Sequence, residues 1–368
     1  MSKRDKVQQE ALEQALSNQR VGLGISMGVG KTLIGLRYLQ HFWEKGEMVN
    51  ALIVAPKTSI FQSWKDDAIK FSIDPKMMDN IEFTTYLSLP KRNLDYSIVI
   101  LDECHSLLYS HKDWLTNYTG KILGLTGTPP RYKNSEKGEM VAQFCPIKYK
   151  YITDDAVDDE ILNDYRIIVH RMPLSSRANI LVKLKDKEFY TSEVKNYNYW
   201  SSRFYDANTP KQRQIVSVMR MRALMDFKTK ETYVKKLLED IEEKCIVFAN
   251  TQQQADRISK YSVHSGNFDA DENLMKFKLG EINKLSCVLQ LNEGVNIPEL
   301  RVGIIMHAYG NERKSNQRLG RLLRLNPDET AIIHVLCYKN TIDENWVGEA
   351  LKDLDQSKIK YFDINEPF

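Results

Sequence analysis

Short apolar runs, separated by polar and helix-like stretches, recur along the first 150 residues. The clearest runs are residues 51–54, 97–101 and 122–125. They are apolar at nearly every position instead of at alternate positions, which is typical of parallel strands buried on both faces of a sheet. The pattern predicts an α/β fold whose helices cover a parallel sheet.

A second set of runs predicts another α/β lobe further along the chain. Residues 154–164 are acidic and lack periodicity, so we expect them to form an inter-lobe linker. Residues 176–243 are polar and aromatic and are expected to be helical. The later runs are residues 167–169, 245–248, 287–289, 302–306 and 331–335, followed by a closing helix near 342–354. We therefore expect lobes at residues 1–153 and 165–368.

Composition and charge restrict the possible size, partners and location of the protein but do not identify a function. A chain of 368 residues suits two domains of ordinary size. Lys and Arg number 52 against 49 Asp and Glu, so the net charge of +3 does not by itself indicate a polyanionic partner. The five cysteines are isolated and lack metal-ligand spacing, so we interpret them as reduced core residues. Without a signal-like or membrane-length apolar run, we expect a cytoplasmic protein of a bacterium or a phage-infected cell, with no membrane partner.

The segment Gly28-Val29-Gly30-Lys31-Thr32 indicates a phosphate-binding loop. Its glycines allow backbone N–H groups to approach phosphate oxygens at the start of a helix. Lys31 would reach the β- and γ-phosphates of ATP, and the Thr32 hydroxyl would ligate Mg²⁺. The strict pattern places a glycine at position 25, where this chain has Ile25. The alternative is a tight glycine turn before a helix with an exposed lysine.

Two carboxylates follow the apolar run at 98–101. Asp102 is expected at the carboxyl edge of the sheet, where it would hold Mg²⁺. Glu103 would orient and deprotonate the water that attacks the γ-phosphate. His105 either couples the nucleotide to the other lobe or is a core or capping histidine. Cys104 is interpreted as a packing residue.

Near the end of the chain, Gln317, Arg321 and Arg324 have the spacing of one helix face, with three leucines between them. Taken with the upstream segments, the two arginines are candidate arginine fingers that neutralise the phosphates of ATP. The alternative is an ordinary solvated basic face.

Taken together, these segments resemble the motifs of superfamily 2 helicases and translocases over nearly the whole chain. Residues 28–32 resemble motif I, and Asp102-Glu103-Cys104-His105 resembles motif II. The other matches are Thr126-Gly127-Thr128 to motif III, residues 51–57 followed by Trp64 to motif Ia, residues 246–251 to motif IV, residues 291–298 to motif V, and residues 317–324 to motif VI. The resemblance implies two RecA-like domains with parallel sheets that close on ATP.

The resemblance also implies further site residues. Gln8 would contact adenine, Thr126 and Thr128 would couple the lobes with His105, and Gln317 would bind nucleotide. Relatives hold a nucleic-acid strand through positions that correspond to Lys57, Thr58, Asn250, Thr251 and Gly294. Asn296 stands where many relatives carry an aspartate that touches the ribose.

The expected function is an ATP- and Mg²⁺-dependent helicase or translocase that acts on DNA without reading its sequence. The DECH spelling, Trp64 and the helical segment are more similar to remodeller-type translocases and compact phage helicases than to DEAD-box RNA helicases. The alternatives are an RNA helicase and an ATP-switched nucleoprotein clamp that does not translocate. An accessory replication or repair protein is a further expected partner. The aromatic and basic residues of 197–230 either stack on bases or form that segment's own core and solvated face.

Overall fold

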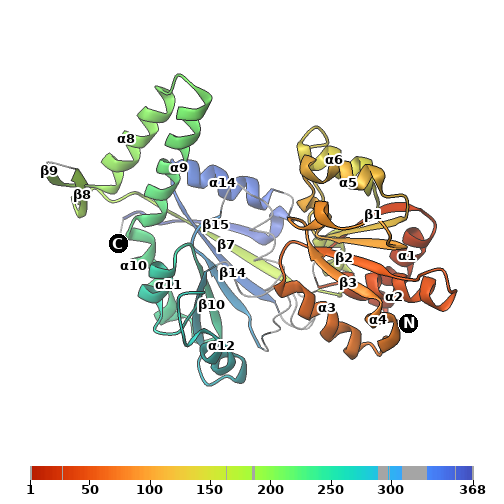
Figure 1. Ribbon diagram of the computed structural model, residues 1–368. Helices are drawn as coiled ribbons and strands as arrows, with labels where there is room; N and C mark the ends of the chain where they lie inside the picture. The colour runs from red at the N-terminus through yellow and green to blue at the C-terminus, as the bar shows by residue number, and fades with distance from the viewer. Residues whose placement is uncertain are drawn as a thin grey trace. The chain divides into compact units, whose positions relative to one another are not determined.

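The computed structural model describes residues 2–26, 28–162, 164–184, 187–288, 297, 299–308, 330–352 and 354–366. They form two compact units, one that ends at Asp164 and one that begins at Tyr165. Each unit contains its own parallel sheet and helices, as Figure 1 shows. The expected α/β class is confirmed for both.

Within the described residues, the sheet of the first unit has six parallel strands in the order β3-β2-β4-β5-β1-β6. The strands are β1 (Arg20–Ile25), β2 (Ala51–Ala55), β3 (Ile81–Thr85), β4 (Ile98–Asp102), β5 (Lys121–Thr126) and β6 (Ile147–Tyr151). The three apolar runs of this region correspond to β2, β4 and β5. Every residue of β2 and β4 is buried, which explains why these strands lack alternation.

Helices cover both faces of this sheet. They are α1 (Lys3–Leu16), α2 (Lys31–Glu44), α3 (Ser59–Lys70), α4 (Pro75–Asp79), α5 (Lys112–Asn117), α6 (Glu136–Phe144) and α7 (Thr153–Asp158), with short 3₁₀ turns at Leu89–Lys91, Cys104–Ser106 and Tyr109–His111. Figure 1 shows α5 and α6 on one face and α2 and α3 on the other. On the first face Leu101, Trp114 and Phe144 belong to one buried cluster.

The described residues of the segment 154–164 belong to the first unit. They include most of α7, and Ala156, Val157 and Leu162 are buried. Arg4 on α1 donates a hydrogen bond of 3.0 Å to the carbonyl of Ile161. The acidic composition of the segment therefore marks the surface of a short helix, which is too short to display a periodicity.

The described residues of the second unit form a sheet of seven parallel strands in the order β11-β12-β10-β13-β14-β7-β15. They are β7 (Tyr165–Met172), β10 (Cys245–Ala249), β11 (Ser262–Val263), β12 (Lys284–Val288), β13 (Val302–Ile305), β14 (Ala331–Tyr338) and β15 (Ile359–Asp363). The helices are α8 (Glu193–Tyr205), α9 (Pro210–Asp226), α10 (Thr229–Asp240), α11 (Gln252–Ile258), α12 (Ala270–Leu279) and α14 (Ile342–Leu351), with a 3₁₀ turn at Gln356–Lys358.

The expectation of helix throughout residues 176–243 is wrong for its first part. Strands β8 (Ile180–Leu184) and β9 (Lys187–Thr191) form an antiparallel hairpin, and α8, α9 and α10 follow it. Ile180 and Val182 on β8 and Phe189 and Tyr190 on β9 are β-branched or aromatic residues that favour strands. Figure 1 shows the hairpin and parts of α8 and α9 projecting from the second unit.

All five cysteines have free thiols and are buried, in agreement with their interpretation as core residues. Across the described residues, every helix is too short or too polar to cross a membrane.

Candidate nucleotide site

Three strand ends of the first unit bring the sequence-predicted nucleotide residues to one edge of its sheet. Strand β5 lies between β1 and β4. The register pairs Gly24 with Thr126 and Asp102 with Leu125. Because all three strands are parallel, the loop after β1, motif II after β4 and motif III after β5 leave the same carboxyl edge. This is the edge at which open α/β sheets bind ligands.

The loop after β1 has the backbone of a phosphate cradle. Gly28 and Gly30 have φ angles of 89° and 112°, in the left-handed region that glycine adopts without strain. Gly30 is the N-cap of the 14-residue helix α2 and has no side chain to cap it. The positive end of that helix therefore faces the loop, an arrangement that favours phosphate binding.

Gln8 on α1 contacts this loop. Its Nε2 donates a hydrogen bond of 2.6 Å to the carbonyl of the buried Val29. A Cβ at position 30 would lie 2.4 Å from the same nitrogen, so Gly30 also leaves room for Gln8. The amide of Gln8 therefore lies beside the loop. Contact with adenine stays a prediction.

Lys31 and Glu103 approach each other at the sheet edge. Lys31 Nζ lies 4.0 Å from Glu103 Oε1 and 3.4 Å from the carbonyl oxygen of Ile25. Glu103 is buried and has φ 50° and ψ 54°, a left-handed backbone conformation that is uncommon outside glycine. Strain of this kind concentrates at functional sites, and here it accompanies the carboxylate that was predicted to be the base.

His105 belongs to a polar network behind Glu103. Its Nδ1 lies 3.3 Å from Glu103 Oε2 and 2.5 Å from Thr126 Oγ1. Thr128 donates its backbone N–H to the same Thr126 oxygen at 3.1 Å, and its hydroxyl lies 3.4 Å from His105 Nδ1. The structure thus joins motif II to motif III within the first unit. Coupling to the other lobe stays a prediction.

Asp102 is held from two sides by residues that sequence reasoning did not assign to it. The indole Nε1 of Trp64 donates a hydrogen bond of 2.9 Å to Asp102 Oδ2. The hydroxyl of Tyr86 donates to the main-chain carbonyl of Asp102, also at 2.9 Å. In the sequence, Trp64 follows motif Ia and contributes to the similarity to remodeller-type translocases, but nothing in its spacing points to a carboxylate 38 residues away.

The donor set fits Mg²⁺ and a nucleoside triphosphate. Asp102 is a carboxylate at the sheet edge, and Thr32 supplies a hydroxyl in the first turn of α2. Hard oxygen ligands of this type suit Mg²⁺, which usually keeps several waters and binds one or two carboxylates together with phosphate oxygens. The glycine cradle would take the phosphates and Lys31 would neutralise them.

The expected nucleic-acid contacts are described in part. Lys57 and Thr58 are exposed between β2 and α3, and β2 is the neighbour of β4. In the second unit, Thr251 is the N-cap of α11 and its hydroxyl accepts a hydrogen bond of 3.1 Å from the Gln254 N–H. Asn250 donates its backbone N–H to the Gln254 side chain at 2.9 Å. Gly294, Asn296, Gln317, Arg321 and Arg324 lie outside the described residues.

The aromatic residues of α8 divide between packing and exposure. The guanidinium of the buried Arg220 lies 4.3 Å from the ring centre of Phe204. Tyr197 accepts a hydrogen bond of 2.9 Å from the Ile342 N–H. Tyr199 and Tyr205 are exposed. The first two favour the interpretation as a local core, whereas the exposed pair remains accessible to other molecules.

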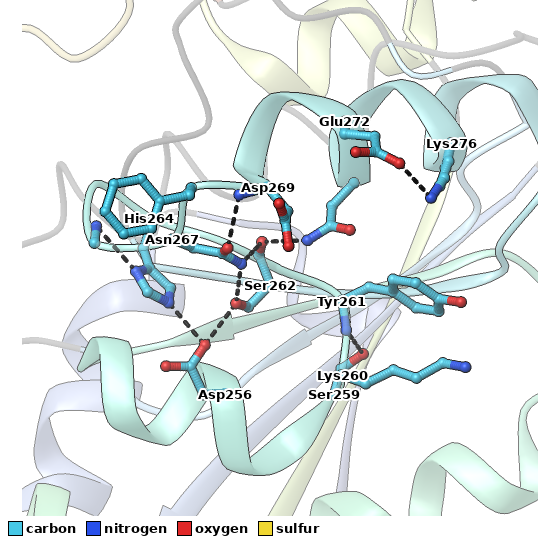
Figure 2. A pocket seen from close by; sticks show the side chains of 13 residues that line it. Asp256, Ser259, Lys260, Tyr261, Ser262, His264, Asn267, Asp269, Glu272 and Lys276 are labelled. Atoms are coloured by element: carbon cyan, nitrogen blue, oxygen red, sulfur yellow. Dashed lines mark hydrogen bonds and ion pairs between the residues drawn. The ribbon is translucent and has the colours of Figure 1, made fainter.

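A hollow on the second unit was not predicted from the sequence. Its volume is about 470 Å³, and its lining includes Asp256, Ser262 and His264 (Figure 2). Oδ1 of Asp256 accepts from Ser262 Oγ at 2.6 Å and lies 2.8 Å from His264 Nε2. Since serine and histidine both contact the carboxylate, this is not the serine-to-histidine contact that nucleophilic catalysis needs. The network instead fixes β11 against α11.

Family comparisons match both halves of the chain. The family described as "Type III restriction enzyme, res subunit" matches residues 2–131, and "Helicase conserved C-terminal domain" matches residues 229–326. A curated relative from Sulfurisphaera tokodaii, named DNA 3'-5' translocase XPB2, is 27% identical over 367 residues. The alignment covers 91% of this chain and 82% of the relative.

Solved structures share the fold at lower identity. One is an ATP-dependent Type ISP restriction-modification enzyme, LlaBIII, bound to DNA, with a TM-score of 0.59 and 14% identity. The match covers 99% of this chain, which spans only 31% of that enzyme. A fragment of a putative HsdR subunit of a type I restriction enzyme from Vibrio vulnificus has a TM-score of 0.61 and 17% identity. That match covers 98% of this chain and 68% of the fragment. Both support the RecA-like fold.

Proposed function

The chain belongs to the superfamily 2 helicases and translocases, and on that premise we propose that it hydrolyses ATP to move along DNA. The observation that carries the proposal is the convergence of Lys31, Asp102 and Glu103 at the carboxyl edge of the first sheet, beside the glycine loop. A cation, a metal-binding carboxylate and a second carboxylate are the parts that phosphoryl transfer to water requires.

Each of these residues has a proposed role in hydrolysis. The loop at 28–30 and the start of α2 bind the phosphates through backbone N–H groups. Lys31 neutralises the β- and γ-phosphates, while Thr32 and Asp102 hold Mg²⁺. Bound Mg²⁺ would neutralise the charge that develops on the phosphate oxygens. Glu103 orients the attacking water and accepts its proton, and Gln8 contacts the adenine.

The second half of the chain has a proposed catalytic role of its own. Arg321 and Arg324, with Gln317, would bind the phosphates of the same ATP as arginine fingers. This part of the proposal is supported by the helix-face spacing of the three residues and by the family match over residues 229–326. His105, Thr126 and Thr128 would connect the state of the nucleotide to the rest of the molecule.

DNA is the nucleic acid along which the chain is proposed to move. The relative named as a DNA translocase supports DNA over RNA. Lys57 and Thr58 would contact phosphates from the first lobe, and Asn250, Thr251 and Gly294 from the second. Such contacts position a strand without reading its bases. An accessory replication or repair protein and a cytoplasmic location complete the proposal, the latter supported by five free thiols in the core.

Displacement of a third strand from a DNA triplex tests for movement. The chain with ATP and Mg²⁺ should release the third strand, because a motor that advances along the duplex removes whatever is bound ahead of it. Glu103→Gln is the matched control, since it should retain DNA and ATP binding but lack hydrolysis. DNA-stimulated hydrolysis without strand release would contradict translocation and would indicate an ATP-switched clamp instead.

A further inference from the structure

Trp64 is buried at a junction of the first unit. It lies in the middle of α3 and is only 1% exposed. Its indole N–H donates a buried hydrogen bond of 2.9 Å to Oδ2 of Asp102. Strand β2, which leads into α3, pairs directly with β4, which ends at Asp102. The indole therefore spans the short distance between a helix and the end of a neighbouring strand.

The same ring packs against the phosphate-loop helix. Gly35 lies one turn after Lys31 on α2, and a Cβ there would be 2.6 Å from Cη2 of Trp64 and 3.1 Å from Cζ3. Glycine is unfavourable inside a helix, so its presence at 35 reflects the close approach of the ring. Trp64, which itself lies on α3, thus contacts α2 and the end of β4, two elements that carry parts of the proposed site.

We propose that Trp64 is a positioning residue that orients the Asp102 carboxylate for Mg²⁺ and links it to α3, the helix that begins after the proposed DNA contacts Lys57 and Thr58. The inference rests on the proposed function. A donor on one carboxylate oxygen fixes the direction of the other, and partners of this kind raise the affinity of a site for its metal.

The link has a consequence for DNA binding. A strand that contacts Lys57 and Thr58 acts on the start of α3, and Trp64 lies on the second turn of that helix. A small displacement of α3 changes the hydrogen bond to Asp102. Because linkage is reciprocal, DNA then changes the affinity for Mg²⁺-nucleotide, and Mg²⁺-nucleotide changes the affinity for DNA by the same factor.

The experiment measures nucleotide binding without turnover. Fluorescence anisotropy of a labelled ADP is followed in the full chain as MgCl₂ is increased, with and without a DNA oligonucleotide. Trp64→Phe should raise the Mg²⁺ concentration at half-saturation by roughly 10–100-fold, the usual effect of losing such a partner. With DNA present, the wild-type midpoint should shift, and the Trp64→Phe midpoint should shift less.

Trp114 offers a matched control. It is also buried in the first unit, and its Nε1 donates a hydrogen bond of 2.9 Å to the backbone carbonyl of Arg92. Trp114→Phe therefore loses an equivalent hydrogen bond away from the site and should keep the wild-type midpoint. A benzothienylalanine at position 64 replaces only the N–H by sulfur and keeps the ring volume, so its midpoint should rise as in Trp64→Phe even where that variant folds poorly.

The outcomes separate the inference from the proposed function. Wild-type protein that binds no nucleotide at any Mg²⁺ concentration overturns the proposed function and this inference with it. Normal wild-type binding with an unchanged midpoint in both position-64 variants, or an equal shift in Trp114→Phe, overturns the positioning role alone. Equal DNA-induced shifts in wild type and Trp64→Phe overturn the link to α3.

Discussion

Lys31 Nζ and Glu103 Oε1 lie 4.0 Å apart, although the two residues are separated by 72 positions along the chain. One follows β1 and the other follows β4, and the parallel register brings both to the same sheet edge. An ammonium group next to a carboxylate is the arrangement expected where a phosphate and its attacking water meet. The two residues should nevertheless contribute differently to binding and to hydrolysis.

Lys31→Ala and Glu103→Gln should each reduce ATP hydrolysis by about 10²–10³-fold, because one loses charge neutralisation and the other the base. Lys31→Ala should also weaken ATP affinity, whereas Glu103→Gln should retain bound ATP. Steady-state turnover and equilibrium binding of labelled ATP measure the two effects. Lys45→Ala, at the opposite end of α2, is the control. Near-normal turnover in Lys31→Ala would contradict the site.

Arg321→Ala and Arg324→Ala should lower DNA-stimulated hydrolysis by about 10³-fold or more, as the loss of an arginine finger does. ATP affinity should largely persist, because the glycine loop and Lys31 belong to the first unit. Turnover, ATP binding and circular dichroism are measured together, with Arg166→Ala on the exposed side of β7 as the control. Intact turnover in both variants would show that these arginines do not act on ATP.

Lys230 and Asp343 form an ion pair of 2.6 Å in which both side chains are fully buried. Burial raises the pKa of Asp343, against the pull of the Lys230 charge. Lys230 Nζ also donates to the carbonyls of Met306 and Leu336, at 2.8 and 3.0 Å, so it ties together the ends of β13 and β14.

Lys230→Met should destabilise the second unit by about 3–5 kcal/mol, because Asp343 would be left buried and uncompensated. The double variant Lys230→Met/Asp343→Asn should recover part of this loss, since the amide oxygen can still accept from the Tyr338 N–H. Hydrogen exchange of peptides from β13, β14 and α14 reports the local free energy of opening. A double variant less stable than Lys230→Met would refute the explanation by unpaired charge.

Two buried histidines predict a loss of stability in mild acid. His170 Nε2 lies 2.8 Å from His334 Nδ1, and Tyr233 OH lies 2.7 Å from His170 Nδ1. Burial lowers the pKa of each imidazole from 6.5 to about 4, with the neighbouring His334 a further cause for His170. The folded state therefore favours the neutral form. The stability that the neutral imidazoles contribute to the folded state is fully present above pH 6.5 and is lost as the pH falls toward 4.

Between pH 7.5 and pH 5, each histidine should remove about 2 kcal/mol of stability from the second unit. The variant His170→Gln/His334→Gln should show a smaller decline over the same interval, because it lacks the groups that titrate. Urea unfolding at both pH values, read by pulsed hydrogen exchange of β7 and β14 peptides, gives the comparison. An identical pH dependence in both proteins would exclude the histidine pair as the cause.

The sequence predicted what local patterns encode. Strands β2 and β10, and β4 up to Asp102, are continuous apolar runs because both faces of their sheets are covered, and such runs can be recognised without a partner. The loop at 28–32 was recognisable because a left-handed turn before a helix requires glycine. The hairpin β8–β9 was missed because its short strands lie within a polar segment otherwise rich in helix.

Long-range partners could not be predicted in this way. Trp64 and Asp102 are 38 residues apart, and Lys230 and Asp343 are 113 apart. A tryptophan inside an amphipathic helix reads as a packing residue, and a lysine on a polar helix reads as solvated. The folded sheets bring Trp64 to Asp102 and Lys230 to Asp343. The residues proposed to bind nucleotide were thus chosen by type from the sequence, whereas the contacts that support them required the fold.

ATP turnover with and without nucleic acid tests the central claim most directly. The purified chain of residues 1–368 is assayed with Mg²⁺ alone, with DNA of several unrelated sequences, and with RNA of matched length. The proposed DNA translocase should hydrolyse ATP slowly by itself and much faster with every DNA, and the stimulation should fall as salt is raised because phosphate contacts release counterions. Stronger stimulation by RNA, or no stimulation by either polymer, would contradict the account.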